Sequence, residues 1–202
     1  MKKIVAIILE GISDETVLTS GLSQILENDS FHIEIFRGNL LTSDFNSPKS
    51  AKALVGDYIK ETLLNTRYLK LEDIAYIIQV ADIDDVYSNS NLNSYQELHK
   101  NRLDILSRTN NILGVPYLLY YMSANLEEVI SGRKVCTDEE KEEISNEFAF
   151  KYLDDYKGYK NFFDNIINNK FNDYNSSWIY IKNGQSGKMS NLSYFLELIE
   201  NL

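Results

Sequence analysis

The sequence predicts an α/β protein: a mostly parallel four-stranded sheet with helices on both faces, followed by a mainly helical C-terminal extension. Three observations predict it. Apolar runs long enough for buried strands recur within the first 122 residues, and segments with helical apolar spacing separate them. From residue 123 onward helical spacing dominates. We therefore expect an α/β core over residues 1–122 and an extension over 123–202 that packs on it.

The first half of the predicted core contains two strands and two helices. The apolar run Ile4–Leu9 is typical of a strand buried on both faces. Residues 14–28 and 48–66 carry apolar side chains at helical spacing. Between these helices, residues 31–36 alternate apolar and polar side chains, which indicates a half-buried or edge strand.

The second half of the core continues the alternation with strands at 74–81 and 115–122 around a helix at 95–109. Strands that alternate with helices favour a parallel sheet with right-handed crossovers. In the extension we expect a short helix, a charged helix, a late strand and a closing amphipathic helix, at 125–131, 138–155, 178–181 and 190–202.

Composition limits the classes of function. The chain has 202 residues, 44% of them hydrophobic, which fits a soluble globular protein, and its formal net charge of −10 argues against nucleic-acid binding through a basic face. Bound divalent cations would weaken that objection, because each offsets two negative charges. The lone cysteine, Cys136, fits a reducing, cytoplasmic location. No stretch approaches the roughly 20 apolar residues of a membrane span.

The strongest chemical signal is that two predicted buried strands end in carboxylates. Glu10 follows the first strand, and Asp82 and Asp84 follow the third. In α/β sheets ligands bind beyond the carboxyl ends of the strands, and Mg²⁺ prefers oxygen ligands. The pattern therefore predicts a divalent-metal site. It requires the two strands to be neighbours and the three carboxylates to cluster within reach of one metal centre.

Neighbouring acids have more ordinary interpretations. In an extended Asp-x-Asp, Asp82 and Asp84 point to the same side, and Asp85 points to the other as a solvated loop residue and a second-tier candidate for the site. Asp14 fits a helix cap as well as a position near the metal.

The segment Leu9-Glu10-Gly11-Ile12-Ser13-Asp14, followed some seventy residues later by a strand and Asp82-Ile83-Asp84, resembles the Toprim domain of topoisomerases, primases and OLD-type nucleases. The resemblance covers residues 1–122. It implies that Glu10 is the catalytic general acid/base and that Asp82, Asp84 and Glu10 surround the Mg²⁺ (or Mn²⁺). It also implies that Gly11 permits a tight turn and that Asp14 lies near the metals.

The chain departs from the larger Toprim proteins. It has neither a zinc ribbon nor a Gly-x-x-x-x-Gly-Lys motif, so it is similar to compact stand-alone nucleases of the RloB-like kind, associated with phage defence or mobile elements. In such proteins a polar segment after the fourth strand approaches the site, which makes Asn125 and Glu127 second candidates; a helix cap and a first-turn acid explain them equally well. Lys182 and Lys188 are the expected phosphate contacts.

The expected function is metal-dependent phosphodiester hydrolysis on DNA or RNA. A partner ATPase or another protein partner is compatible with it, and no membrane partner is expected. Two alternatives stay open at this point. One is a non-catalytic Toprim-like module that binds a partner. The other is a nucleotide-sugar transferase, in which an Asp-x-Asp also holds a divalent ion but Glu10-Gly11-x-x-Asp14 has no role.

Overall fold

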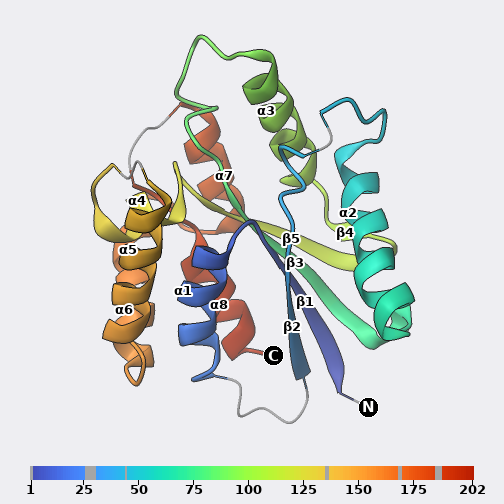
Figure 1. Ribbon diagram of the computed structural model, residues 1–202, viewed down its shortest axis with the longest axis horizontal. Coiled ribbons are helices and arrows are strands. Elements are labelled where there is room, and N and C mark those ends of the chain that lie inside the picture. Colours follow the sequence, from blue (N-terminus) through green and yellow to red (C-terminus); the bar gives the residue numbers. More distant parts are fainter. Residues whose placement is uncertain (1, 26–30, 44, 135–136, 168–169, 185–187) are drawn as a thin grey trace. The chain divides into compact units, whose positions relative to one another are not determined.

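The computed structural model describes residues 2–25, 31–43, 45–134, 137–167, 170–184 and 188–202 (Figure 1). The chain forms two compact units that alternate along the sequence. The first, here called the sheet unit, comprises Met1–Glu10, Asp29–Ala81 and Asn91–Leu119. The second, the helical unit, comprises Gly11–Asn28, Asp82–Ser90 and Tyr120–Leu202. These bounds differ from the expected 1–122 and 123–202, because 11–28 and 82–90 group with the C-terminal helices.

A five-stranded, mostly parallel sheet confirms the α/β class. Its order is β2-β1-β3-β5-β4 (Figure 1). The strands are β1 (Lys3–Leu9), β2 (Phe31–Arg37), β3 (Ile74–Asp82), β4 (Asn111–Ile112) and β5 (Val115–Met122). The four longer strands lie where the apolar runs predict them, and β2 lies at one edge, as its alternating pattern indicates.

The central strands explain the continuous apolar runs. β1 pairs in parallel with β2 on one side and with β3 on the other. Every residue from Ile4 to Leu9 is buried, so neither face of β1 meets water. Each fully buried Ile or Leu side chain contributes roughly 1.5–3 kcal/mol, which makes this strand a major source of stability.

The fifth strand was not expected from the sequence. β4 has only two residues, Asn111 and Ile112, and pairs with β5 in antiparallel fashion. Leu113 and Gly114 join the two strands with φ of 54° and 83°. Two consecutive positive φ angles are what a tight two-residue hairpin requires. A two-residue strand is too short to produce a hydrophobic period, and this explains why the prediction had four strands.

Two helices belong to the sheet unit (Figure 1). α2 (Ala51–Ile59) begins after Ser50, whose Oγ accepts the Ala53 amide, and continues as a π-helical stretch, η1 (Lys60–Asn65). A short 3₁₀ turn, η2 (Leu71–Asp73), precedes β3. α3 (Ser94–Leu106) begins with a capping box in which Asn93 accepts the Gln96 amide and Gln96 Oε1 accepts the Asn93 amide.

The helical unit contains the other α-helices of the described residues: α1 (Ile12–Leu22), α4 (Leu126–Ser131), α5 (Asp138–Lys151), α6 (Tyr156–Ile167), α7 (Tyr174–Lys182) and α8 (Leu192–Glu200). α1 packs against α4, α5 and α6, and α6 also packs against α8. Edge-to-face aromatic contacts between α5 and α6 fill this core, with Phe148 against Tyr159 and Phe163.

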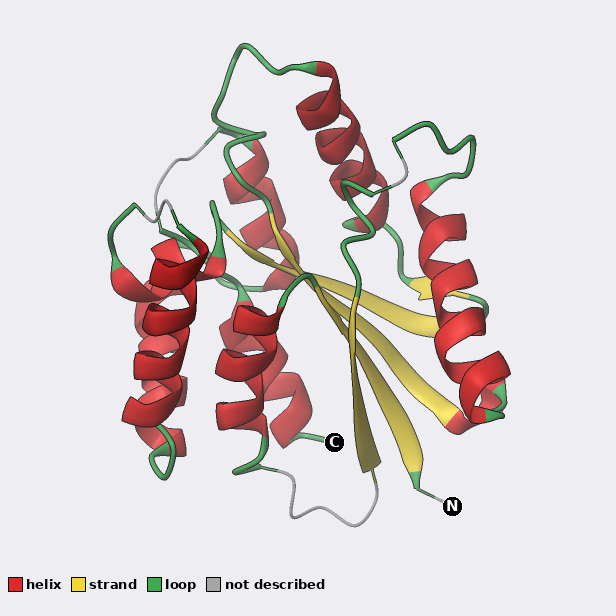
Figure 2. Cartoon of the chain, viewed as in Figure 1, coloured by secondary structure: helices red, strands yellow, loops and turns green. Residues whose placement is uncertain are grey.

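The predicted strand at 178–181 is wrong, because these residues lie inside α7 (Figure 2). Asp173 starts the helix by accepting the Ser176 amide at 2.7 Å. Trp178 and Ile181 are buried three residues apart, while Ile179 is 62% exposed. This spacing is helical and does not alternate. A four-residue apolar run fits either element, and only the cap before it distinguishes them.

Two predictions fall partly outside the described residues. The expected end of the first helix at Asn28 lies there, and so does Cys136. Within the described ranges, no helix is long and apolar enough to cross a membrane.

Candidate functional site

The two strands that end in acids are neighbours. β1 and β3 pair in parallel, with Ile8 opposite Gln79, so their carboxyl ends lie at the same edge of the sheet. Glu10 follows β1 as the last residue of its segment of the sheet unit and is half-buried. Asp82 ends β3 and opens a segment of the helical unit. The strand adjacency that the metal-site hypothesis requires is therefore present.

Asp82 has a clear local role at the start of α4. One of its oxygens, Oδ1, accepts the backbone amide of Leu126 at 3.1 Å. Asn125 Oδ1 accepts the amide of Glu128 at 2.8 Å, which makes Asn125 the N-cap. The cap interpretation of Asn125 is thus confirmed. Two acceptors at the N-terminus of this helix satisfy amides that have no partner within the helix.

Asp84 departs from the extended Asp-x-Asp geometry expected from the sequence. Its φ is 46°, in the left-handed region. The Asp84 amide donates to the Ala124 carbonyl at 2.9 Å, and the Ala124 amide donates back at 3.2 Å. Ala124 also has a positive φ, 62°. Strand alternation therefore does not apply to Asp84, because the chain leaves the sheet after Asp82 to form this backbone pair. Positive φ at two non-glycine residues costs of order 1–3 kcal/mol each, and such strain is concentrated at functional sites.

Asp84 and Asp85 differ in electrostatics. Burial by neighbouring protein atoms raises the pKa of Asp84, although the residue reaches solvent, and the negative charges of Asp85 and Glu128 raise it further. Asp85 is exposed, and its Oδ2 accepts the Asn89 side-chain amide at 3.1 Å. It is the loop residue that the sequence predicts.

Asp14 is both a helix cap and a buried acid. Its Oδ2 accepts the Gly11 amide at 2.8 Å, and only 8% of the residue is exposed. Burial, followed by the negative charge of Glu127, raises the pKa of Asp14 from 3.8 to about 6. Glu127, in the first turn of α4, is 3% exposed. Two buried carboxyls therefore lie within electrostatic reach of each other.

Gly11 does not need to be glycine for a turn. Its φ of −137° and ψ of −177° are extended backbone that any residue adopts. A Cβ there would lie 3.4 Å from Asp14 Oδ2, which is an ordinary contact. The expectation that Gly11 permits a tight turn is therefore corrected: the residue is the N-cap of α1 in an unstrained conformation.

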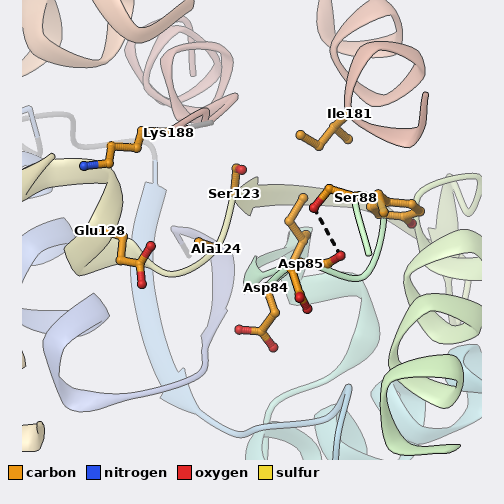
Figure 3. A pocket seen from close by; sticks show the side chains of 10 residues that line it. Asp84, Asp85, Ser88, Ser123, Ala124, Glu128, Ile181 and Lys188 are labelled. Carbon is orange, nitrogen blue, oxygen red and sulfur yellow. Dashed lines mark hydrogen bonds between the residues drawn. The ribbon is translucent and has the colours of Figure 1, made fainter. Parts of the chain in front are cut away.

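A cavity of about 230 Å³ opens beside Asp84. Figure 3 shows Asp84, Asp85 and Glu128 around it, with Lys188 at its border. The ammonium of Lys188 is also close to the end of α4, since a Cβ on Gly132 would lie 3.5 Å from Nζ. Lys182 has a different environment: its Nζ lies 5.4 Å from the centre of the Trp178 ring. Of the two predicted phosphate contacts, Lys188 lines this cavity.

Two functional candidates were missed from the sequence. Lys141 of α5 lowers the pKa of both Asp14 and Asp84, so one cation acts on both acids. The sequence does contain a signal for Lys141, because it is the one lysine among the six acids of residues 138–147. Glu128 borders the cavity and raises the pKa of Asp84. No spacing rule distinguished it from Glu127.

The donor set fits a hard cation in part. The acids of the helical unit offer oxygen ligands and are crowded enough to raise each other's pKa. Among the described residues, however, no group of three or more His, Cys, Asp or Glu side chains is arranged to hold a metal ion, so the clustering of three carboxylates that the sequence hypothesis requires is not found there. Mg²⁺ retains several waters and needs one or two carboxylates from the protein, so the chemistry fits a partly hydrated ion.

Comparison of the chain with protein-family models, with curated proteins and with solved structures finds no match.

Proposed function

We propose that this protein is a metal-dependent nuclease that hydrolyses phosphodiester bonds in DNA or RNA with Mg²⁺ or Mn²⁺. The observation that carries the proposal is the parallel pairing of β1 with β3, two buried strands that run directly into Glu10 and Asp82, with Asp84 at an open cavity two residues later. Asp14 and Asp84 both hold protons more tightly than ordinary aspartates, through burial and through neighbouring negative charge. A divalent cation relieves such repulsion more effectively than the single ammonium of Lys141.

Asp82 and Asp84 are the residues that would hold the ion. Asp84 borders an open cavity, so a hydrated ion can reach its carboxylate from solvent. Asp82 is fixed by the Leu126 amide, so its carboxylate is already oriented. When bound, the ion supplies Lewis-acid stabilisation of the phosphate and lowers the pKa of a bound water. The strained Asp84–Ala124 backbone pair keeps Asp84 at the cavity without rearrangement.

Glu10 would move the proton. The resemblance to Toprim domains implies this role for Glu10, which directly follows β1. In this role Glu10 accepts the proton of the attacking water or returns one to the leaving oxygen. Asp14 and Glu127 are positioning residues in this proposal. Their negative charge increases the attraction of the site for cations.

Lys188 would contact the phosphate. It is the one lysine or arginine among the described residues that line this cavity, and its ammonium, which Figure 3 shows directed away from Asp84, would turn toward the phosphate. The net charge of −10 disfavours long contacts with a nucleic-acid backbone. We therefore expect weak binding of substrate in the absence of the metal and cleavage that depends on it.

The test is cleavage of single-stranded and duplex DNA and RNA in Mg²⁺ or Mn²⁺, compared with EDTA. Glu10→Gln, Asp82→Asn and Asp84→Asn should each lower the rate by roughly 100- to 10,000-fold, with circular dichroism unchanged. Glu139→Gln removes the same charge from an exposed site on α5 and should cleave like the wild type. Equal cleavage by all five proteins, or no metal-dependent cleavage by the wild type, overturns the proposal.

A further inference from the structure

We propose that the cavity beside Asp84 is a pocket for one nucleobase of the substrate and that it selects bases with an exocyclic amino group, guanine above all. The inference rests on the proposed nuclease function and names the substrate feature that the site reads. It is carried by the size of the cavity, its apolar walls, and the carboxylate of Glu128 that faces it.

The size of the cavity fits a single ring system. Its volume, about 230 Å³, lies below the roughly 300–1,000 Å³ of pockets that enclose drug-sized ligands. A nucleobase with part of its sugar is a ligand of this smaller class. A run of stacked nucleotides is too large to enter.

The walls of the cavity suit a flat apolar face. Ile83 and Ile181 form its fixed apolar floor, because they line it but are only 2% and 1% exposed and offer little surface of their own. Tyr87 adds an aromatic side chain. Enzymes that act on an unstacked nucleotide replace lost base stacking with aromatic and apolar walls of this kind.

The polar groups of the cavity favour a base that donates hydrogen bonds. Glu128 presents a carboxylate, which only accepts when ionised (Figure 3). Guanine offers two adjacent donors, N1–H and the N2 amino group, which match the two oxygens of a carboxylate. Cytosine and adenine offer their amino groups. Uracil and thymine present carbonyl oxygens beside a single N–H, so a carboxylate at that edge meets repulsion.

The pocket is rigid before any ligand binds. The Ile83 amide donates to the Met122 carbonyl at 2.9 Å, and the Ser123 amide donates to the Met189 carbonyl at 2.6 Å. Together with the Asp84–Ala124 pair, these bonds fix the backbone on two sides of the cavity. A preformed pocket loses little conformational entropy on binding, so small differences between bases appear as differences in affinity.

The pocket also lies next to the proposed chemistry. Asp84 and Lys188 belong to its lining, so a base bound here brings its own phosphate toward a proposed metal ligand and a cation. Base selection would then act on the phosphodiester adjacent to the bound base.

Binding of nucleosides tests this inference without catalysis or phosphate. In EDTA at pH 7.5, titration calorimetry with guanosine, 1-methylguanosine and uridine should show guanosine binding about tenfold or more tightly than the other two. Glu128→Gln, which keeps shape and removes the charge, should lower the affinity for guanosine by about tenfold. Ser88→Trp, which places a bulky ring at the exposed border of the cavity, should block all three nucleosides. Glu139→Gln is the matched control and should bind like the wild type.

The outcomes separate the two proposals. Equal affinity for guanosine and uridine, or an unchanged preference in Glu128→Gln, overturns the base pocket. Metal-dependent cleavage with no preference for the base beside the cut overturns it as well and leaves the nuclease proposal standing. Binding of guanosine by a protein that cleaves no nucleic acid supports the pocket and refutes the hydrolysis.

Discussion

The buried carboxyl groups of Asp14 and Glu127 lie within electrostatic reach of each other, 8% and 3% exposed, on α1 and α4 of the helical unit. Proteins rarely bury acids unless the acids are paired with a cation or coordinate a metal. Here the balancing charge is Lys141, which lowers the pKa of Asp14 less than burial and Glu127 raise it. Buried acids with raised pKa values lower the stability of a folded domain, and they are concentrated at binding and catalytic sites.

The pKa of Asp14 predicts how stability depends on pH. Its pKa is about 6 in the folded chain, against an ordinary value of 3.8, so the folded state binds the proton more tightly. The contribution of Asp14 to the free energy of unfolding is therefore fully present below pH 3.8 and is lost as the pH rises through 6. The loss is about 3 kcal/mol at 1.36 kcal/mol per pKa unit.

Asp14→Asn should remove this dependence. Asparagine can still accept the Gly11 amide, and it cannot ionise. Urea unfolding in EDTA from pH 4 to 7.5 should show the variant gaining on the wild type as pH rises, by up to about 3 kcal/mol. Parallel profiles for the two proteins would show that Asp14 does not carry the titration. Glu139→Gln, at an exposed site, should leave the wild-type profile unchanged.

The charges around Asp14 predict opposite effects of two substitutions on its pKa. Glu127→Gln removes a negative charge and should lower the pKa of Asp14, though not to its ordinary value, because burial is the larger cause. Lys141→Gln removes the stabilising cation and should raise it. The measurement is the ¹³C chemical shift of the Asp14 carboxyl through a pH titration. Shifts in the same direction for both variants contradict the electrostatic account.

A divalent ion should stabilise the protein more at neutral than at acidic pH. Protons and metal compete for the carboxylate of Asp84, a proposed ligand that holds its proton more tightly than an ordinary aspartate. Thermal unfolding with Mg²⁺ in large excess over the protein should give a larger rise in Tm at pH 7.5 than at pH 5. Asp84→Asn should reduce the rise at pH 7.5. An equal rise at both pH values would place the ion at groups that do not titrate there.

The fold was largely predictable because buried parallel strands leave a strong signal. Strands covered on both faces read as unbroken apolar runs, and Val115–Met122 was predicted with the bounds that β5 has. The weakest predictions were those for short elements. β4 has only two residues, too few to show a period, and the four-residue apolar run inside α7 is too short to distinguish a strand from a helix.

The candidate site was predictable in composition and only partly in geometry. Acids after strands were visible as a pattern, and the adjacency of β1 and β3 follows from ordinary sheet topology. The left-handed conformation of Asp84 was not visible, since it depends on Ala124, forty residues later. Likewise, the burial of Asp14 depends on helices that follow residue 122. Long-range packing leaves no local signature in a single sequence.

Close packing of α1 and α6 predicts that Gly21 cannot be enlarged. A Cβ on Gly21 would lie 2.3 Å from a ring carbon of Tyr159, which is fully buried. Replacing a helical glycine by alanine ordinarily stabilises a helix by about 1 kcal/mol. Here the tyrosine ring or the helix must move, and overpacking of this kind costs about 1–3 kcal/mol. Gly21→Ala should therefore lower the free energy of unfolding.

Gly56 provides a matched control within α2. A Cβ on Gly56 would lie 3.4 Å from Leu113 Cδ2, an ordinary contact, so Gly56→Ala should be neutral or stabilising by up to about 1 kcal/mol. In a Tyr159→Ala background the ring is gone, and Gly21→Ala should then lose its cost. Urea unfolding of the double-mutant cycle measures this coupling between Gly21 and Tyr159. If Gly21→Ala and Gly56→Ala change the free energy of unfolding by the same amount, the packing of α1 against α6 does not require glycine at position 21.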